Sequence, residues 1–240
     1  MVKAERKKGL AAVSHSQFMF CLVMLLLVNT LAAQEIVTAP NYFTQVAQTY
    51  ETVEDYLAEI SISRGEGERM TGQLYYRHPN LLRIDFTQPE EQVLVTDGES
   101  LTLYIPAMNV TMKQSLADRQ QGDDITAMAS REGLGLLRRM YNVSYLTSPT
   151  PVPLEEGSSE MVVKLRLTWR NPSEGFREII VSIGSDMLIR RMVGTTVNYD
   201  EVVLDFSNIQ INQNIPVEQF DYRSPPSANQ FHGFLFGSGN

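Results

Sequence analysis

The sequence predicts a mainly β fold of the α+β class, built on a strongly curved antiparallel sheet with helices packed against it. Between residues 70 and 212, bulky apolar residues alternate with polar ones in several short runs, which is the period of a strand with one buried face. Proline, asparagine and glycine separate these runs at hairpin spacing. Two other stretches, 41–62 and 125–141, repeat apolar residues every three or four positions, as helices do.

The first 33 residues have the pattern of a cleaved secretory signal. Four basic residues precede an apolar run from Phe18 to Val28, and small residues follow at 30–33. The run of eleven residues is short for a membrane-spanning helix, so a cleaved signal is favoured over an uncleaved anchor. Cys21 lies within this run, outside the context of a lipoprotein processing site. We therefore expect a signal at 1–33, one domain at 34–226 and an apolar tail at 227–240.

Cleavage would make the chain more acidic. Removing four Lys/Arg residues and Glu5 from totals of 20 and 28 leaves 16 basic and 27 acidic residues, a net charge of −11. Such a surface repels nucleic acid and anionic lipid headgroups, so no nucleic-acid partner is expected.

The first predicted helix covers residues 41–62. Either Thr38 or Asn41 is a suitable N-cap. The apolar stripe consists of Phe43, Val46, Tyr50, Val53, Leu57 and Ile60.

Four strands are predicted between Met70 and Ile105. Pro79-Asn80, Pro89 and the turn pair Asp97-Gly98 separate them. In the second and the fourth of these strands, the apolar positions alternate strictly with polar ones: Leu82, Ile84 and Phe86, then Leu101, Leu103 and Ile105.

Residues 107–124 lead into a polar tract, 118–124, that we expect to be an exposed loop. Asp123 or Asp124 would then cap a second helix at about 125–141. Gly133 and Gly135 weaken this helix by about 1 kcal/mol each. A helix weakened in this way is suited to a hinge or a lid, although a break between two short helices is an equal alternative.

Strand signals return after a loop at 149–157. The clearest alternation runs from Met161 to Trp169. Four more strands are predicted at 176–183, 187–193, 195–204 and 205–212, with turns near 171–172, at 184–186 and at Gly194. The resulting eight to ten strands suit either a half-barrel or a sandwich, with helices on the concave side.

Residue sets for catalysis are poorly represented. Only His78 and His232 remain after the signal, and no cysteine pair, nucleophile elbow or phosphate-binding loop is present. Carboxylate pairs such as Glu90-Glu91 lie in predicted loops, where acidic residues are normally solvated. We therefore expect no metal, no cofactor and no enzymatic activity. A hydrolase is a distant alternative.

The order of motifs in 70–105 resembles one family. A strand ends in a basic residue before Pro79-Asn80, the next closes on Thr87-Gln88-Pro89, and an apolar strand leads through Asp97-Gly98 to a strand ending in Leu103-Tyr104. This order is similar to that of the LolA-type periplasmic carriers of lipoproteins. The resemblance implies an unclosed antiparallel half-barrel with a helical lid over its concave face.

In that family, side chains pointing into the half-barrel form an acyl-chain cavity. Carried over by strand parity, the resemblance assigns this role to Leu74, Tyr76, Leu82, Ile84, Phe86, Leu101 and Leu103. Met128 and Met140 join them because methionine adapts to chains of differing length and both lie in the predicted lid.

One position departs from the family pattern. The family's arginine directly before Pro-Asn holds the lid shut by hydrogen bonds, but His78 stands there and the arginine is Arg77. A shift of one residue turns a side chain to the opposite face of a strand. We therefore predict that His78 is the lid latch and holds the lid more loosely, because it has fewer donors than arginine, or else that other groups hold the lid.

The resemblance implies a monomeric, periplasmic carrier whose partners are acylated lipoproteins, an ATP-driven release complex in the inner membrane, and an acceptor at the outer membrane. A carrier or sensor for another lipid on the same fold remains an alternative. The apolar tail, with Phe231, Phe234, Leu235 and Phe236, could cover the open end of the barrel, present a patch to a partner, or simply dock as a chain terminus.

Overall fold

The computed structural model describes residues 37–65, 67, 69–116, 129–171 and 176–232. The described residues belong to one compact unit, Val37–Asn240. The predicted signal, the polar tract at 118–124, Met128 and the last three apolar residues of the tail lie outside the described ranges.

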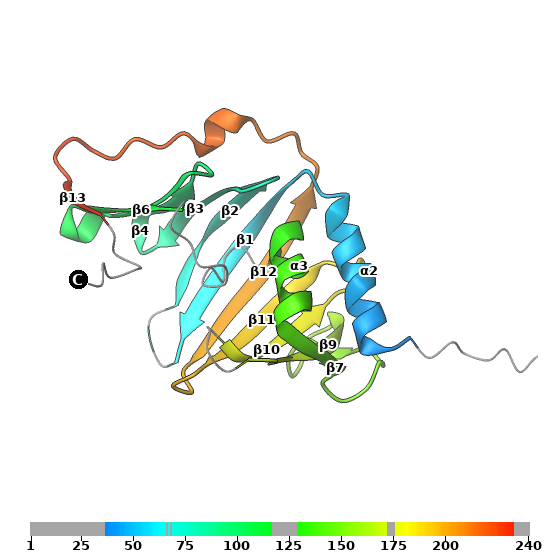
Figure 1. The fold of residues 1–240 in the computed structure, drawn as a ribbon. Coiled ribbons are helices and arrows are strands. Elements are labelled where there is room, and N and C mark those ends of the chain that lie inside the picture. Colours follow the sequence, from blue (N-terminus) through cyan, green and yellow to red (C-terminus); the bar gives the residue numbers. More distant parts are fainter. Residues whose placement is uncertain (1–36, 66, 68, 117–128, 172–175, 233–240) are drawn as a thin grey trace, which may run out of the picture. The chain divides into compact units, whose positions relative to one another are not determined.

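A 13-stranded sheet dominates the described part of the chain (Figure 1). Its strands are β1 (Asp55–Arg64), β2 (Met70–Arg77), β3 (Leu81–Gln88), β4 (Glu90–Thr96), β5 (Ser100–Ile105), β6 (Val110–Ser115), β7 (Tyr141–Tyr145), β8 (Val152–Pro153), β9 (Met161–Trp169), β10 (Phe176–Ile183), β11 (Ile189–Thr196), β12 (Glu201–Ile211) and β13 (Asn229–His232). Their spatial order is β13-β6-β5-β4-β3-β2-β1-β12-β11-β10-β9-β7, with β8 paired to β9. The end strands β13 and β7 do not pair, so the curved sheet is unclosed, as predicted.

The four strands predicted between residues 70 and 105 are confirmed as β2 to β5, and each is antiparallel to its neighbour. The Asp97-Gly98 turn has a clear local cause. The Asp97 carboxylate accepts hydrogen bonds from the backbone N–H groups of Glu99 and Ser100 at 2.9 and 2.8 Å. Gly98 supplies a positive φ of 90°, which costs glycine little.

The first helix, α2 (Ala39–Glu51), is shorter than predicted. Thr38 caps it, as expected, by accepting a hydrogen bond from the Asn41 N–H. The extension to residue 62 is wrong, because Leu57 and Ile60 lie on β1. From residue 56 onward the inward-facing residues recur every second position, which is the period of a strand. These residues are Tyr56, Ala58, Ile60 and Ile62, all buried.

The second helix, α3 (Arg131–Met140), begins later than predicted. Its N-cap is Ser130, whose hydroxyl accepts a hydrogen bond from the Gly133 N–H at 3.1 Å, rather than Asp123 or Asp124. The helix continues through both glycines, so the predicted break is absent from it. Tyr141, the predicted end of the helix, is the first residue of β7.

Three short strands were not predicted: β6 within the expected loop 107–124, β8 within the loop 149–157, and β7 directly after α3. A fourth, β13, adds the beginning of the tail to the sheet as a parallel neighbour of β6, with Phe231 opposite Met112. These strands have two to six residues, which is too short for alternation to be distinctive.

The prediction of a turn at Gly194 is wrong. This glycine lies inside β11, and the chain reverses later, where the Thr196 N–H donates to the Asp200 carbonyl at 2.9 Å. The region 187–212 therefore forms two strands, not three. Gly194 is required by packing, because a Cβ atom there would lie 2.5 Å from Cδ1 of Phe176. The missing side chain at Gly194, which suggested a turn, instead leaves space for the Phe176 ring.

A C-terminal crossover, residues 213–228, connects β12 to β13 across the sheet (Figure 1, orange to red). Its backbone is held by side chains from the sheet. The buried Asp55 carboxylate accepts hydrogen bonds from the N–H groups of Gln213 and Ile215 at 2.6 and 3.1 Å. Arg77 and Arg83 donate to the carbonyl groups of Ile215 and Gln219. Asp55 therefore ties the beginning of β1 to the beginning of the crossover.

Replacing Asp55 by asparagine is expected to lower the free energy of unfolding by about 2–4 kcal/mol. The amide keeps the size of the carboxylate, but its NH₂ group must face one of two backbone donors, and charge-assisted hydrogen bonds contribute about 1.5–3 kcal/mol each. Urea denaturation of both variants measures the change. Asp221→Asn, at an exposed position of the crossover, is the matched control. An equal, small change in both would contradict the role of Asp55.

Candidate functional site

The concave face of the sheet carries most of the residues that the sequence assigned to an acyl-chain site. On β2 and β3, the pairs Tyr76–Leu82 and Leu74–Ile84 lie directly opposite each other, and Phe86 lies opposite Gly72. Leu103 reaches the same face through its pairing with Leu94, which in turn pairs with Ile84. Strand parity therefore brings these side chains to one face, along with Leu101 two positions before Leu103.

Both helices pack against this face, and Figure 1 shows them over the part of the sheet labelled β9 to β12. Phe43 and Val46 of α2 and Leu134 of α3 are fully buried and belong to the same cluster as Leu74 and Ile84. Met140, at the end of α3, packs against this cluster and is partly exposed. In this arrangement, five predicted site residues are core residues: Leu74, Tyr76, Leu82, Ile84 and Phe86. Leu101 is also buried, whereas Leu103 is partly exposed.

A cavity of about 10 Å³ remains where the helices meet β1, β11 and β12. This volume is close to that required by one water molecule. Its lining residues are Tyr50, Val53, Tyr56, Ala129, Leu188, Ile189, Phe206, Ile209 and Ile211. This cavity is far too small for an acyl chain.

Few polar contacts join the N-terminal end of α3 to the sheet. The Tyr76 hydroxyl donates a hydrogen bond to Oε2 of Glu132 at 3.0 Å, and the Tyr56 hydroxyl donates to the Ala129 carbonyl at 3.1 Å. Burial, reinforced by the Glu132 charge, raises the pKa of Tyr76, and burial also raises the pKa of Tyr56. Both phenols therefore remain protonated donors. Glu132 lies in the first turn of α3, where the helix dipole favours a negative charge.

His78 approaches the same carboxylate. Its Nδ1 atom lies 3.1 Å from Oε1 of Glu132, but it makes no hydrogen bond within the described residues. The two atoms are close, but their geometry is not that of a hydrogen bond. Arg77, the neighbouring residue, contacts the Ile215 carbonyl on the crossover instead of α3, as the alternation of side chains along a strand predicts.

Sequence reasoning identified His78 but missed Glu132 and Tyr56 as contacts of α3. Glu132 gives no local signal, because it lies in the middle of a stretch predicted to be one longer helix. Its partners Tyr76 and His78 are more than 50 residues earlier in the sequence, and only the tertiary fold brings them together.

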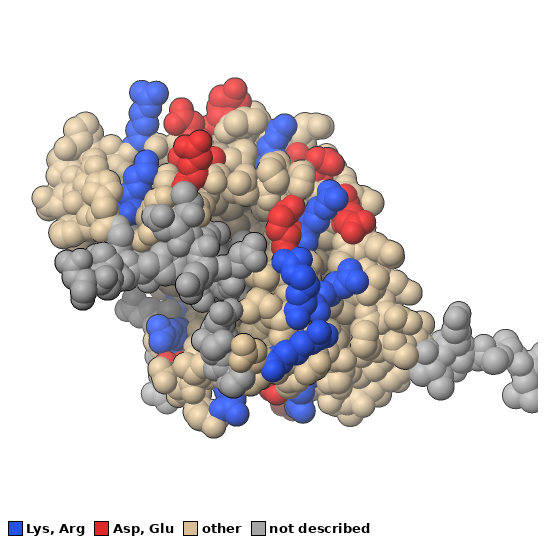
Figure 2. Space-filling view, in the orientation of Figure 1, with Lys and Arg blue, Asp and Glu red and all other residues tan. Residues whose placement is uncertain are grey.

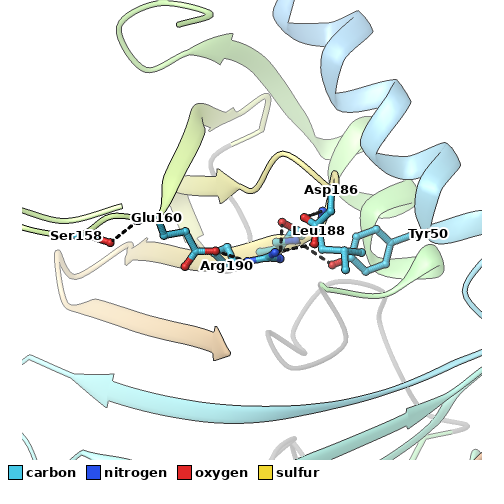
Figure 3. A network of polar contacts seen from close by, with 7 residues as sticks. Tyr50, Ser158, Glu160, Asp186, Leu188 and Arg190 are labelled. Atoms are coloured by element: carbon cyan, nitrogen blue, oxygen red, sulfur yellow. Dashed lines mark hydrogen bonds and ion pairs between the residues drawn. The ribbon is translucent and has the colours of Figure 1, made fainter. Parts of the chain in front are cut away.

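A separate polar network fixes α2 to the turn between β10 and β11 (Figure 3). The Tyr50 hydroxyl accepts a hydrogen bond from the Ile189 N–H at 3.1 Å, and burial raises the pKa of Tyr50 to about 12. Next to it, Arg190 donates to Asp186 at 2.6 Å and to Glu160 at 2.5 Å. α2 thus has a buried apolar face and a buried hydrogen bond to a turn that the ion pairs of Arg190 stabilise.

The contrast between the two helices indicates which one can move. The fully buried apolar anchors of α3 are Leu134 and Leu137, worth roughly 3–6 kcal/mol together at about 1.5–3 kcal/mol each, and Met140 adds a partly buried contact. α2 buries five residues, including two aromatic ones. Displacing α3 therefore costs less apolar burial than displacing α2.

The described part of the chain shows neither a metal site nor a membrane-spanning helix. No group of three or more His, Cys, Asp or Glu side chains is placed there to hold a metal ion. None of the described helices has the length and apolar character needed to cross a membrane.

Comparison with known proteins identifies the family. The family described as "Outer membrane lipoprotein carrier protein LolA" matches residues 61–223. An outer-membrane lipoprotein carrier protein of Bordetella avium is 24% identical over 159 residues, covering 66% of this chain and 69% of the relative. One of Azotobacter vinelandii is 22% identical over 192 residues, covering 78% and 84%.

Among solved structures, an uncharacterized conserved protein from Thermus thermophilus has the same fold. It aligns with a TM-score of 0.52 at 15% sequence identity, covering 79% of this chain and 98% of that one. The family match spans more than half of the chain, from within β1 to a point inside the crossover. The chain therefore belongs to the LolA family of outer membrane lipoprotein carrier proteins.

Proposed function

We propose that this chain is a periplasmic carrier, not an enzyme, that binds the acyl chains of lipoproteins against the concave face of its sheet. It would receive its cargo from an ATP-driven release complex at the inner membrane and pass it to an acceptor at the outer membrane. A secretory signal at residues 1–33 would deliver it to the periplasm. Family membership supports the class of cargo, and the names of the relatives support the direction of transport.

The observation that carries the proposal is the cover of the concave face by α3. The helix closes an apolar face through two leucines and a small set of polar contacts. The cavity beside this cover, between Ala129 and β12, holds only about 10 Å³. In this proposal, α3 is the lid: it protects the apolar face when no cargo is bound and gives way to the acyl chain.

The energies of the two states are compatible with such an exchange. An acyl chain with about 12 buried methylene groups gains roughly 10 kcal/mol, at about 0.8 kcal/mol each. The two lid leucines lose roughly 3–6 kcal/mol when they leave the face. Cargo can thus displace the lid, while the returning lid offsets part of the cost of releasing the cargo.

The polar contacts of Glu132 would act as the latch of this lid, with His78 and Tyr76 on the sheet side. Arginine at the position of His78 would offer five donors, whereas neutral histidine offers one. A histidine latch therefore holds the lid less firmly, which favours loading and release over long retention.

A release assay tests the proposal. The processed protein is added with ATP to spheroplasts that carry their native lipoprotein release machinery, and the soluble fraction is examined for acylated lipoprotein bound to it. A soluble one-to-one complex is expected. If lipoprotein stays in the membrane although a fluorescent fatty acid binds the protein, the cargo is another lipid. If neither binds, the proposal fails.

Glu132→Gln is expected to increase lid opening about fivefold, because it removes the charge that faces Tyr76 and His78. The estimate corresponds to about 1 kcal/mol, reduced because the Glu132 side chain is 47% exposed. The reaction rate of a cysteine introduced at buried Leu137 with a thiol reagent reports opening. His78→Ala is expected to act in the same direction.

Glu99→Gln in the same Leu137→Cys background is the matched control, because Glu99 is an exposed carboxylate of the β4–β5 turn. If the Glu99→Gln, Glu132→Gln and His78→Ala proteins are labelled at equal rates, Glu132 and His78 do not hold the lid closed.

Leu103→Glu is expected to weaken binding of a fluorescent fatty acid by at least about tenfold, because a carboxylate on the concave face is costly to bury beside an acyl chain. Leu103 is partly exposed, so the substitution disturbs the closed core less than a change at Leu74 would. Thr102→Glu places the same charge on the opposite face of β5 and is expected to leave binding unchanged. Similar losses in both variants would argue against the concave face as the binding site.

A further inference from the structure

The outward face of α3 is basic, although the chain as a whole is acidic, with a net charge of −8. Arg131, Arg138 and Arg139 are all exposed. At 100° per residue they fall within an arc of about 100°, whose centre is about 120° around the helix from that of Leu134 and Leu137. Figure 2 shows Lys and Arg side chains gathered over the position that α3 occupies in Figure 1.

These three guanidinium groups are not used by the fold. None of them forms an ion pair with a carboxylate among the described residues, and the nearby Glu132 is engaged by Tyr76 and His78. Two of the four other exposed arginines in the described residues do have carboxylate partners: Arg64 lies 3.0 Å from Asp200, and Arg69 lies 3.7 Å from Asp205. Within the described part of the chain, these three guanidinium groups therefore have no carboxylate partner.

Helix electrostatics explains only part of this pattern. Arg138 and Arg139 lie in the last turn, where the helix dipole favours cations. Arg131 lies in the first turn, where the dipole disfavours a positive charge. Arg131 is thus a positive charge at the unfavourable end of the helix, about 10 Å along the helix axis from Arg138 and on the same side. This placement suggests that Arg131 binds a group outside this chain.

The composition of this face indicates the kind of partner. Protein interfaces have an apolar centre surrounded by a polar rim, but the exposed residues of α3 are Arg131, Glu132, Arg138 and Arg139, with no apolar side chain among them. Gly135 lies between the arginines, and the space around its Cβ position is open. Arginine binds phosphate groups through paired N–H donors. A layer of phosphate groups fits this face better than a protein surface does.

We propose that the arginine face of α3, defined as Arg131, Arg138 and Arg139, docks this protein onto anionic phospholipid headgroups. The proposal rests on the carrier function, since it brings the lid helix to the surface from which acyl chains must be taken. The acidic remainder of the chain is repelled by the same surface, so the protein binds in one orientation, with the lid toward the lipid. The expectation that the protein avoids anionic lipid therefore holds for its average charge and not for α3.

Flotation with lipid vesicles tests the docking surface. Protein exported and processed by the cell is mixed with vesicles of phosphatidylcholine, with and without about 30 mol% phosphatidylglycerol. Binding is expected only with the anionic lipid, and it should weaken as salt rises from about 50 to about 200 mM. R131Q/R138Q/R139Q is expected to bind on the order of 100-fold more weakly, since each basic residue near such a surface contributes roughly a fivefold factor.

The matched control is R64Q/K113Q/R223Q, which removes three exposed basic residues from other elements. It is expected to bind anionic vesicles within about twofold of the unsubstituted protein, and thermal unfolding verifies that both triple variants are folded. Equal loss in both, equal binding to neutral vesicles, or no vesicle binding would overturn the proposal; capture of an acidic protein without vesicle binding would do the same.

The fluorescent fatty acid separates this result from the carrier function. If R131Q/R138Q/R139Q loses vesicle binding but keeps fatty-acid binding, docking and carriage are separate properties of α3, as proposed. If fatty acid fails to bind the unsubstituted protein, the carrier function fails, whatever the vesicles show.

Discussion

The apolar concave face of the curved sheet is the constraint on which the rest of the structure depends. Strands from β2 to β10 direct buried side chains toward it, among them Leu74, Ile84 and Leu165. A face of this kind must be covered, since exposed apolar area costs about 25 cal/mol per Å². Without cargo the protein must supply the cover itself. The two helices do so, and the sheet stays open at its edges because β13 and β7 do not pair.

The two helices share this task unequally. α2 is anchored by Phe43 and Val46 and by the hydrogen bond from the Ile189 N–H to Tyr50, so it acts as a fixed part of the core. α3 is held by two leucines and by contacts concentrated near its first turn. Its outer face is charged, whereas its inner face is apolar. In the proposed function, a single helix therefore responds both to a lipid surface outside the protein and to an acyl chain inside it.

The sequence predicted the fold best where one periodicity operates alone, as in β2 to β5. It failed where two periodicities overlap: Phe43, Val46 and Tyr50 continue at helical spacing into Val53, Leu57 and Ile60, although the chain becomes a strand at Asp55. Strand parity placed the concave side chains on one face, but it could not show that the helices fill it. Glu132 was missed because its partners are distant in sequence, and Gly194 was misread because Phe176 occupies the space beside it.

The most direct test of the central claim is whether α3 leaves the sheet when an acyl chain binds. Spin labels at Gly135→Cys on α3 and Ser207→Cys on the outer face of β12 allow their separation to be measured by pulsed electron paramagnetic resonance, with and without bound acylated peptide. The account predicts that the distance distribution shifts by at least about 4 Å, the thickness of one layer of contacting carbon atoms. An unchanged distribution with acylated peptide fully bound would contradict it.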